Sequence, residues 1–347
     1  MDMQVKLTQF SHGGGCGCKI APGVLEQILA KSAPGLIPKQ LLVGIETADD
    51  AAVYQINDRQ AIVATTDFFM PIVDDPHDFG AIAATNAISD VYAMGGQPLF
   101  ALALVGMPVN QIPMDVIRRI LEGGESVCTR AGIPIAGGHT IDSVEPIYGL
   151  VAIGLVDPRN LKRNSGARPG DQLVLGKPLG VGIYSAALKK GRLDDAGYAA
   201  MIESTTKLNT PGIQLGGLPS VHALTDVTGF GLLGHLLEIT KGSGVMATVN
   251  WDSLPLLPGA LELAREGFVT GASNRNWAGY GARVTLGKGI DEAHRAVLTD
   301  PQTSGGLLVS CAPDRVEETL AIFRSEGFAQ AAVIGSIRTG SPGVTVE

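Results

Sequence analysis

The sequence is short of cysteine and of basic charge, and each shortage excludes a class of protein. Four cysteines in 347 residues cannot supply the disulfide framework of a small secreted domain. Cys128 and Cys311 stand in apolar stretches, where we expect buried, inert thiols. Lysine and arginine number 26 against 34 aspartates and glutamates, a net charge of −8. Proteins that bind nucleic acid or anionic membranes usually carry the opposite balance, so we expect neither partner.

Long apolar runs are missing too. The N-terminus, MDMQVKLTQF, lacks the apolar core of a signal peptide, and no stretch approaches the roughly 18 apolar residues that span a bilayer. We therefore expect a cytoplasmic protein. Two nucleotide-binding motifs are also absent, because GxxxxGK[ST] does not occur and no GxGxxG stands between a predicted strand and helix. A nucleotide, if one binds, is not held by a P-loop or a dinucleotide fold.

Length and composition favour a folded enzyme of two domains. A chain of 347 residues is too long for one ordinary core, and 46 glycines indicate many turns and close backbone contacts. The polar, basic stretch DPRNLKRNSGARPGD (157–171) separates two units that both alternate strands with helices. We therefore predict a loop over residues 1–20, an N-terminal domain over 21–157 and a C-terminal α/β domain over 158–347.

Hydrophobic periodicity predicts the elements of both halves. In the first half we expect helices over 21–32, 78–94 and 114–131, with strands over 41–45, 51–56, 61–66, 99–107 and 148–156 and another ending at 142. In the second half we expect helices near 196–208, 258–266 and 314–325. We expect strands from 172, within 300–311 and, as the last strand, over 331–337. The stretch 222–239 should hold one strand and one helix.

The stretch Ser11 to Lys19, SHGGGCGCK, places two thiols and a lysine directly behind three glycines. The glycines favour neither helix nor strand, so we expect a mobile loop. A plain linker has no use for Cys16, Cys18 and Lys19. A nucleophile carried by a lid, in contrast, needs a thiol and a nearby cation that favours the thiolate. The stretch therefore predicts a catalytic loop.

The C-x-C pair in this loop has three interpretations. The two cysteines are half of a soft-metal site, or they form a strained local disulfide, or one is a nucleophile and the other has no catalytic role. A zinc site needs two further cysteine or histidine ligands, and only His12 is close in sequence. We assign His12 no role, because a loop histidine with a local hydrogen bond is the commoner case. Lys19 is either a solvated lysine or a point charge that meets a transferring phosphate.

Aspartates recur at predicted strand ends and on an otherwise apolar helix face. Asp90 and Asn86 are four residues apart in the helix predicted over 78–94, so they share a face. Carboxylates of this kind suit Mg²⁺ or Mn²⁺ that holds phosphates, whereas each alone is as well explained as a cap or turn residue. The set is Asp49, Asp50, Asp67, Asp90 and Asp226. Three glycine-rich turns whose amides suit phosphates accompany it, namely GGHT (137–140), TGFG (228–231) and TSGG (303–306).

Seven motifs together carry a resemblance to one family. In chain order they are HGGGCGCK, ETADDAAVY, ATTDFFMPIV, ATNAISDVYAMGG, AGGHTID, TDVTGFGLLGH and DPQTSGGLL. A chain with these motifs resembles the selenophosphate synthetases, also called selenide, water dikinases. The match runs from about Leu7 to Val309, whereas residues 189–218 and the tail after Cys311 carry little of it.

The resemblance implies an enzyme that makes selenophosphate from selenide, ATP and water and releases AMP and orthophosphate. It also implies the fold of the aminoimidazole ribonucleotide synthetase superfamily, an α/β architecture. In that fold the strands of an N-terminal, ATP-binding domain close a barrel across a homodimer, and a C-terminal α/β domain follows. The expected partners are ATP, selenide and a second copy of the chain, with Mg²⁺ as the cofactor and a selenium-delivery protein as a further candidate.

Matching motifs carry the family's functional residues onto this sequence. The resemblance implies catalytic roles for Cys16 and Lys19, and we expect Cys18 to be dispensable. It implies magnesium ligands at Asp50, Asp90 and Asp226, and ATP contacts at Lys19, Thr47, Ala48, Asp49, Asp67, Asp90, Gly138, His139 and Thr140. Two alternatives stay open. One is a sibling such as a thiamine monophosphate kinase or aminoimidazole ribonucleotide synthetase; the other is a non-enzymatic selenium or soft-metal carrier that uses the C-x-C loop.

Overall fold

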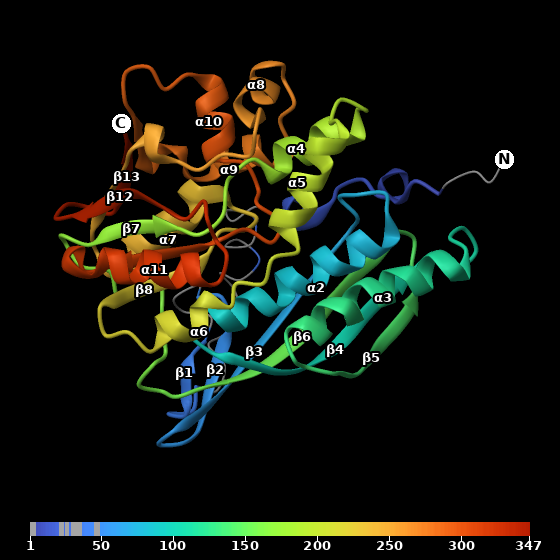
Figure 1. Ribbon diagram of the computed structural model, residues 1–347, viewed down its shortest axis with the longest axis horizontal. Helices are drawn as coiled ribbons and strands as arrows, with labels where there is room; N and C mark the ends of the chain where they lie inside the picture. Colours follow the sequence, from blue (N-terminus) through green and yellow to red (C-terminus); the bar gives the residue numbers. More distant parts are fainter. Residues whose placement is uncertain (1–4, 21–23, 25–27, 29–36, 45–48) are drawn as a thin grey trace.

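The computed structural model describes residues 5–20, 24, 28, 37–44 and 49–347. Its strands form one sheet in each half of the chain, and the two halves pack against each other (Figure 1). Two short 3₁₀ turns precede the first sheet, η1 (Leu7–Phe10) and η2 (Gly15–Cys18). The candidate site lies where η2 meets both halves.

The first sheet has the strand order β1-β2-β3-β6-β4-β5 and is antiparallel except for the pair β4 and β5. In β3, buried and more exposed residues alternate, as expected for a sheet with one covered face. The strands are β1 (Leu41–Val43), β2 (Ala52–Asn57), β3 (Gln60–Phe69), β4 (Gln97–Met107), β5 (Ile135–Asp142) and β6 (Ile147–Val156).

Helices α2 (Pro76–Ala93) and α3 (Met114–Arg130) lie across one face of this sheet (Figure 1). The Asp75 side chain caps α2 by accepting from the Asp78 amide at 3.0 Å, and Pro76 occupies the first turn, where its missing N–H costs nothing. Small residues let the helices approach closely, since a Cβ on Gly80 would come within 1.8 Å of the Ile120 carbonyl oxygen. Nearly all of α2 is buried, so polar residues on it face protein and not water.

The second sheet has the order β10-β13-β9-β12-β7-β11-β8. Apolar side chains cover both of its faces, with α7 on one side and α6 and α11 on the other. Its strands are β7 (Gln172–Leu175), β8 (Val221–Asp226), β9 (Met246–Val249), β10 (Val284–Leu286), β11 (Leu307–Cys311), β12 (Ala332–Arg338) and β13 (Gly343–Val346). The helices of this half are α4 (Val181–Lys189), α5 (Asp195–Thr205), α6 (Pro211–Gly216), α7 (Gly231–Ser243), α8 (Ala260–Arg265), α9 (Gly271–Tyr280), α10 (Glu292–Leu298) and α11 (Val316–Ser325).

The structure confirms the long helices predicted over 78–94 and 114–131 and the strands around them. Cys128 and Cys311 are buried, as expected. The prediction that 331–337 is the last strand is wrong, because β13 follows it and pairs in parallel with β9. The helix predicted over 21–32 falls mostly outside the described residues; Val24 and Ile28 are helical and exposed.

Two further expectations concern domains and membranes. The division of the chain at residues 20 and 157 stays a prediction, although the two sheets lie on either side of 157. Among the helices that the structure describes, none has the length and apolar character needed to cross a membrane.

Candidate active site

The catalytic loop predicted around Cys16 packs into the contact between the two halves. Cys16 is 1% exposed and lies in η2, where the left-handed Gly15 (φ 53°) turns the chain. A Cβ on Gly15 would stand 2.2 Å from Thr303 Oγ1, so only glycine allows this close approach. On the far side, a Cβ on Gly229 would stand 2.7 Å from the Cys16 carbonyl oxygen. Residues of the TGFG and TSGG motifs therefore enclose the cysteine; whether they also hold phosphate stays a prediction.

The Cys16 thiol donates a hydrogen bond to Asn86 Oδ1 at 3.1 Å, and its backbone amide donates to Thr303 Oγ1, also at 3.1 Å. Asn86 Oδ1 also accepts from the Ser304 amide at 2.7 Å. Asn86 comes from the middle of α2, so its helix position fixes the thiol against the loop that precedes β11. We call Cys16, Asn86, Thr303 and Ser304 the thiol side of the site.

Asn86 also connects the thiol to a charge pair. Its Nδ2 donates to Asp67 Oδ2 at 2.7 Å, and the same carboxylate oxygen lies 3.4 Å from Lys19 Nζ. Asp67 is on the covered face of β3, whereas the Lys19 side chain keeps 40% of its surface exposed. Asp67 raises the pKa of Lys19, so the lysine stays charged although part of its side chain is buried.

The thiol is not activated in this conformation. Burial, followed by the charge of Asp67, raises the pKa of Cys16 well above its usual value. Lys19 opposes this rise, but its effect is smaller than either. Lys19 therefore favours the thiolate, as expected, but too weakly to offset burial and Asp67, and Cys16 is a protonated hydrogen-bond donor at neutral pH.

Three predicted magnesium ligands form a second group, which we call the carboxylate side: Asp50, Asp90 and Asp226. Asp50 precedes β2, Asp90 lies one turn after Asn86 on α2, and Asp226 ends β8 of the other half. Burial raises the pKa of each of the three carboxyls. Asp226 raises the pKa of Asp50 and Asp90 further, so the carboxylates are within electrostatic reach of one another.

Hydroxyl groups hold these carboxylates in place. Thr225 Oγ1 donates to Asp50 Oδ1 at 2.8 Å, and Thr65 Oγ1 donates to Asp90 Oδ2. Asp226 Oδ2 accepts from Ser89 Oγ, a neighbour of Asp90 on α2. The carboxylate side thus joins β3, α2 and β8, and each half of the chain contributes a carboxylate to it.

The oxygen atoms of the carboxylate side fit a divalent cation that also binds the phosphates of a ligand. Asp50 Oδ2 is a buried carboxylate oxygen with no hydrogen-bond partner among the residues that the structure describes, which is costly unless a cation or a donor meets it. In the described ranges, no three His, Cys, Asp or Glu side chains are gathered tightly enough to hold a metal by themselves. Magnesium tolerates this arrangement, because it usually binds through one or two carboxylates together with waters and substrate phosphates.

Three other predicted ATP contacts lie apart from this cluster. Gly138, His139 and Thr140 belong to the exposed strand β5, so the prediction of a turn at GGHT is wrong. β5 is the far edge of the first sheet, three strands from β3, or about 14 Å at the usual strand spacing of about 4.8 Å. This chain does not bring Gly138 to Thr140 to the carboxylates.

The remaining predicted contacts have different positions. The Asp49 carboxylate accepts from the Asn164 amide at 2.8 Å and so ties the segment before β2 to the second half. Thr47 and Ala48 lie outside the described residues. His12 is exposed and pairs with Glu145 at 2.9 Å, away from the thiol side, in keeping with its having no assigned role.

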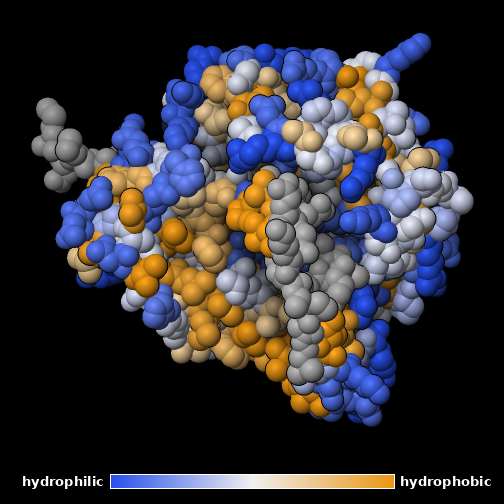
Figure 2. Space-filling model, turned by 180° about the vertical axis from the view of Figure 1, so that it is seen from behind, coloured by the Kyte–Doolittle hydropathy of each residue, from blue (hydrophilic) through white to orange (hydrophobic). Residues whose placement is uncertain are grey.

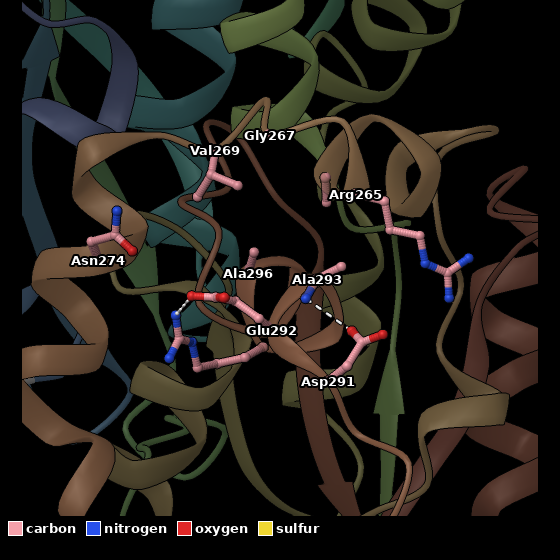
Figure 3. A pocket seen from close by; sticks show the side chains of 10 residues that line it. Arg265, Gly267, Val269, Asn274, Asp291, Glu292, Ala293 and Ala296 are labelled. Carbon is pink, nitrogen blue, oxygen red and sulfur yellow. Dashed lines mark hydrogen bonds and ion pairs between the residues drawn. The ribbon is translucent and has the colours of Figure 1, made fainter.

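A cavity of about 540 Å³ lies elsewhere, among α8, α9 and α10 (Figure 3). Arg295 pairs with Glu292 at 2.8 Å, and Figure 3 shows the Ala293 amide bonded to the Asp291 carboxylate. None of the predicted site residues lines it. The chemistry of the thiol and carboxylate sides therefore does not extend to this cavity.

Several site residues carried no functional prediction from the sequence. Asn86 was noted only for the helix face that it shares with Asp90, yet it is the centre of the thiol side. Ser89 and Thr225 are ordinary polar residues beside a buried acid. The one available signal was an amide on an otherwise apolar helix face, since a buried polar group needs partners.

Comparison with known proteins places this geometry in a family. Residues 48–156 match the family described as AIR synthase related protein, N-terminal domain, and 168–347 match its C-terminal domain. Solved structures share the fold, among them a thiamine-monophosphate kinase from Stenotrophomonas maltophilia K279a, with TM-score 0.65, 23% identity and coverage of 95% of this chain and 96% of that one. Another is the hydrogenase maturation protein HypE in complex with ATP, with TM-score 0.62, 20% identity and coverage of 99% and 94%.

The sequence relatives are much closer. The chain is 67% identical over 343 residues to the selenide, water dikinase of Dechloromonas aromatica, with coverage of 99% of each chain. It is 66% identical over 350 residues to that of Pseudomonas straminea, with coverage of 100% and 97%. On an AIR synthase fold, and with identity of this degree over its whole length, the chain belongs to the selenide, water dikinase family.

Proposed function

We propose that this protein makes selenophosphate from selenide, ATP and water, with release of AMP and orthophosphate. The observation that carries the proposal is that helix α2 supplies a residue to each of two different sites. Asn86 touches the Cys16 thiol and Asp67, and Asp90 lies one turn further along the same helix. A soft nucleophile for selenium and hard oxygen ligands for phosphate-bound metal thus stand side by side.

On this proposal the carboxylate side holds the nucleotide through metal. A triphosphate brings about four negative charges, which Asp50, Asp90 and Asp226 would repel if they faced it bare. Asp50, Asp90 and Asp226 would hold magnesium, which would supply positive charge against the triphosphate and the charge that develops in phosphoryl transfer. The buried Asp50 Oδ2, which has no hydrogen-bond partner among the described residues, supports a cation at this position.

The thiol side and Lys19 act on the transferring group. Cys16 receives or positions selenide, and Lys19 neutralises charge on the γ-phosphoryl group as its bond to the β-phosphate oxygen breaks and a phosphorus–selenium bond forms. Water then hydrolyses the remaining ADP to AMP and orthophosphate. Cys16 is buried and protonated in the described conformation, so the loop must move before selenium can reach it.

We further propose that the protein works as a homodimer whose first sheets close a barrel. The face of this sheet opposite α2 and α3 carries the exposed apolar side chains of Tyr54, Ile56 and Phe68. Figure 2 shows apolar side chains gathered on that side of the molecule. A contiguous apolar face of this kind usually marks an interface. A dimer would also explain the exposed GGHT segment on β5, which would supply its ATP contacts to the site of the other copy.

The reaction is tested by phosphorus NMR of the products formed from ATP, Mg²⁺ and selenide. Selenophosphate, AMP and orthophosphate in equal amounts would support the proposal. ADP as the final nucleotide product, or ATP turnover that does not depend on selenide, would contradict it and favour a sibling kinase. Stoichiometric selenium binding without ATP turnover would favour a carrier.

A further inference from the structure

A buried lysine that the proposed chemistry does not use lies behind the thiol side. Lys177 follows β7, is 2% exposed, and donates from Nζ to two backbone carbonyls, Ser304 O at 2.8 Å and Lys207 O at 2.7 Å. No ion pair found in the described part of the chain includes it. Burial lowers the pKa of Lys177 to about 7. Burial of an ammonium group without an ion-pair partner costs free energy, so we expect its two hydrogen bonds to have a role in the site.

The first of these bonds holds a strained residue. Ser304 has a φ of 54°, a left-handed value that no other non-glycine residue in the described ranges adopts, and it is fully buried. Such conformations persist only where the surroundings fix them, and they are common at functional sites. Lys177 fixes the carbonyl of Ser304, while the amide of the same residue donates to Asn86 Oδ1.

The strained turn at Ser304 positions Cys16 through two hydrogen-bond acceptors. Asn86 Oδ1 accepts both the Ser304 amide and the Cys16 thiol, and Thr303 Oγ1 accepts the Cys16 amide. A shift of the Ser304 peptide would therefore move both acceptors of Cys16 together. The packing is close, since a Cβ on Gly306 would stand 2.3 Å from the Lys177 backbone nitrogen.

The second bond of Lys177 leads to the carboxylate side. Lys207 O lies two residues before Asn209, whose Nδ2 donates to Ser89 Oγ at 2.8 Å and to Gly305 O at 2.9 Å. Ser89 in turn donates to Asp226. Lys177 thus joins the segment that reaches Asp226 to the turn that reaches Cys16.

We propose that Lys177 is a positioning residue of the site, which fixes the strained Ser304 peptide and through it the Asn86 and Thr303 acceptors that hold the Cys16 thiol. The proposal rests on the selenophosphate-forming activity, because that reaction is what requires an oriented thiol. It assigns Lys177 no contact with substrate.

The test is Lys177→Met, which removes the ammonium and keeps most of the side-chain volume. We expect kcat for selenophosphate formation to fall about tenfold or more, with KM for ATP within about twofold, since misplaced catalytic groups cost turnover more than binding. Alkylation of Cys16 by iodoacetamide, read by mass spectrometry relative to Cys18, should become at least about threefold faster as the loosened turn exposes the thiol.

The matched control is Lys207→Met, which removes a neighbouring lysine whose Nζ donates to Gly327 O and contacts neither Ser304 nor Asn86. It should leave kcat and the alkylation ratio within about twofold of the original protein. Lys177→Gln, one atom shorter and unable to reach both carbonyls, replaces the methionine variant if that variant does not fold.

A folded Lys177 variant with an unchanged kcat or an unchanged Cys16 alkylation ratio overturns the proposal. A rise in KM for ATP as large as the fall in kcat also overturns it, because that pattern indicates general loosening of the site. Alkylation needs no turnover. The alkylation experiment therefore tests the positioning role of Lys177 even if the original protein proves to make no selenophosphate.

Discussion

The thiol side and the carboxylate side are built on the same helix, α2, yet their polar groups are satisfied differently. Asn86 uses both ends of its amide, and the Cys16 thiol and amide both have acceptors. On the carboxylate side, Asp50 Oδ2 has no hydrogen-bond partner among the described residues, and burial together with the charge of Asp226 raises the pKa of Asp50 and Asp90. Ser304 Oγ also lacks a partner in the described structure, but the Cys16 thiol has its acceptor without a ligand and must give it up to react, whereas the Asp50 carboxylate suits a cation.

The largest effect is expected for Cys16→Ser. Selenide-dependent AMP formation should fall below detection, because serine replaces the only thiol held by Asn86 in the described structure. The measurement is phosphorus NMR of the products over time. Cys18→Ser is the matched control, since the Cys18 thiol donates to the local Gly15 carbonyl at 2.9 Å and not to Asn86, and it should keep near-normal activity. Full activity of Cys16→Ser would remove the thiol side from the chemistry.

Lys19→Ala removes the cation beside Asp67. Because the proposal assigns Lys19 the charge on the transferring phosphoryl group, we expect its loss to lower kcat about a hundredfold, the usual effect of removing one donor to a developing charge. Steady-state kinetics with ATP as the varied substrate would show KM changing far less. A variant with normal kcat would indicate that Lys19 is only a solvated lysine.

Asp226→Asn should affect nucleotide binding through metal and not selenium chemistry. We expect Mg²⁺-dependent binding of a non-hydrolysable ATP analogue to weaken about tenfold or more, or about 1.4 kcal/mol, in calorimetry. Without Mg²⁺ the variant should melt at a higher temperature, because burial raises the pKa of Asp226 and its ionised form is costly. Asp252→Asn removes an exposed charge as the control. An unchanged Mg²⁺ requirement would count against the ligand role.

Phe68→Asp tests whether the bare sheet face completes the site. Phe68 is on β3, the strand that carries Asp67, but its side chain is 49% exposed on the opposite face. A charge there should shift a dimer toward monomer in sedimentation equilibrium and lower ATP turnover with it. Met114→Asp, at the exposed start of α3, is the control. A dimer unaffected by Phe68→Asp would place the interface elsewhere.

The last prediction concerns stability alone and distinguishes a metal ligand from a merely buried acid. Asp300 is buried and its pKa is raised by burial from 3.8 to about 8, yet it accepts from the Gly182 and Ile183 amides at the start of α4. An acid whose pKa is raised on folding stabilises the protein at low pH, and that contribution is lost as the pH rises from about 4 to about 8.

Asp300→Asn should therefore flatten the pH dependence of the unfolding free energy in this window, by up to about 1.4 kcal/mol per pH unit. Urea unfolding at several pH values measures it. The slope should not respond to Mg²⁺, unlike that of the carboxylate side. An unaltered slope would show that Asp300 is ionised in the folded protein.

Much of the site follows from local sequence, because its chemistry is concentrated in short motifs. Cys16, Lys19 and the aspartates stand out as residue types that an apolar core or a plain loop does not require. The positions that sequence reasoning missed act through tertiary contacts. Asn86 becomes the centre of the thiol side only when α2 packs on β3, and Lys177 meets Ser304 across 127 positions of the chain.

The fold, like the site, has features that local sequence predicts and features that depend on tertiary contacts. Long periodic helices such as α2 and α3 were predictable, because their buried faces repeat over several turns. Short elements were predicted less completely, since β1, β7 and α8 were expected but others were missed. Strands of four residues such as β9 and β13 carry too few residues to show alternation, and α9 is rich in glycine and asparagine. GGHT has the composition of a turn, but pairing with β4 makes it a strand.

The central claim is that the thiol side and the carboxylate side have separate tasks, and nucleotide binding to Cys16→Ser tests it most directly. In calorimetry with Mg²⁺ and a non-hydrolysable ATP analogue, the account predicts a Kd within about threefold of the unsubstituted protein, although turnover is lost. Binding weakened about tenfold or more would contradict the claim, because Cys16 would then belong to the nucleotide site itself.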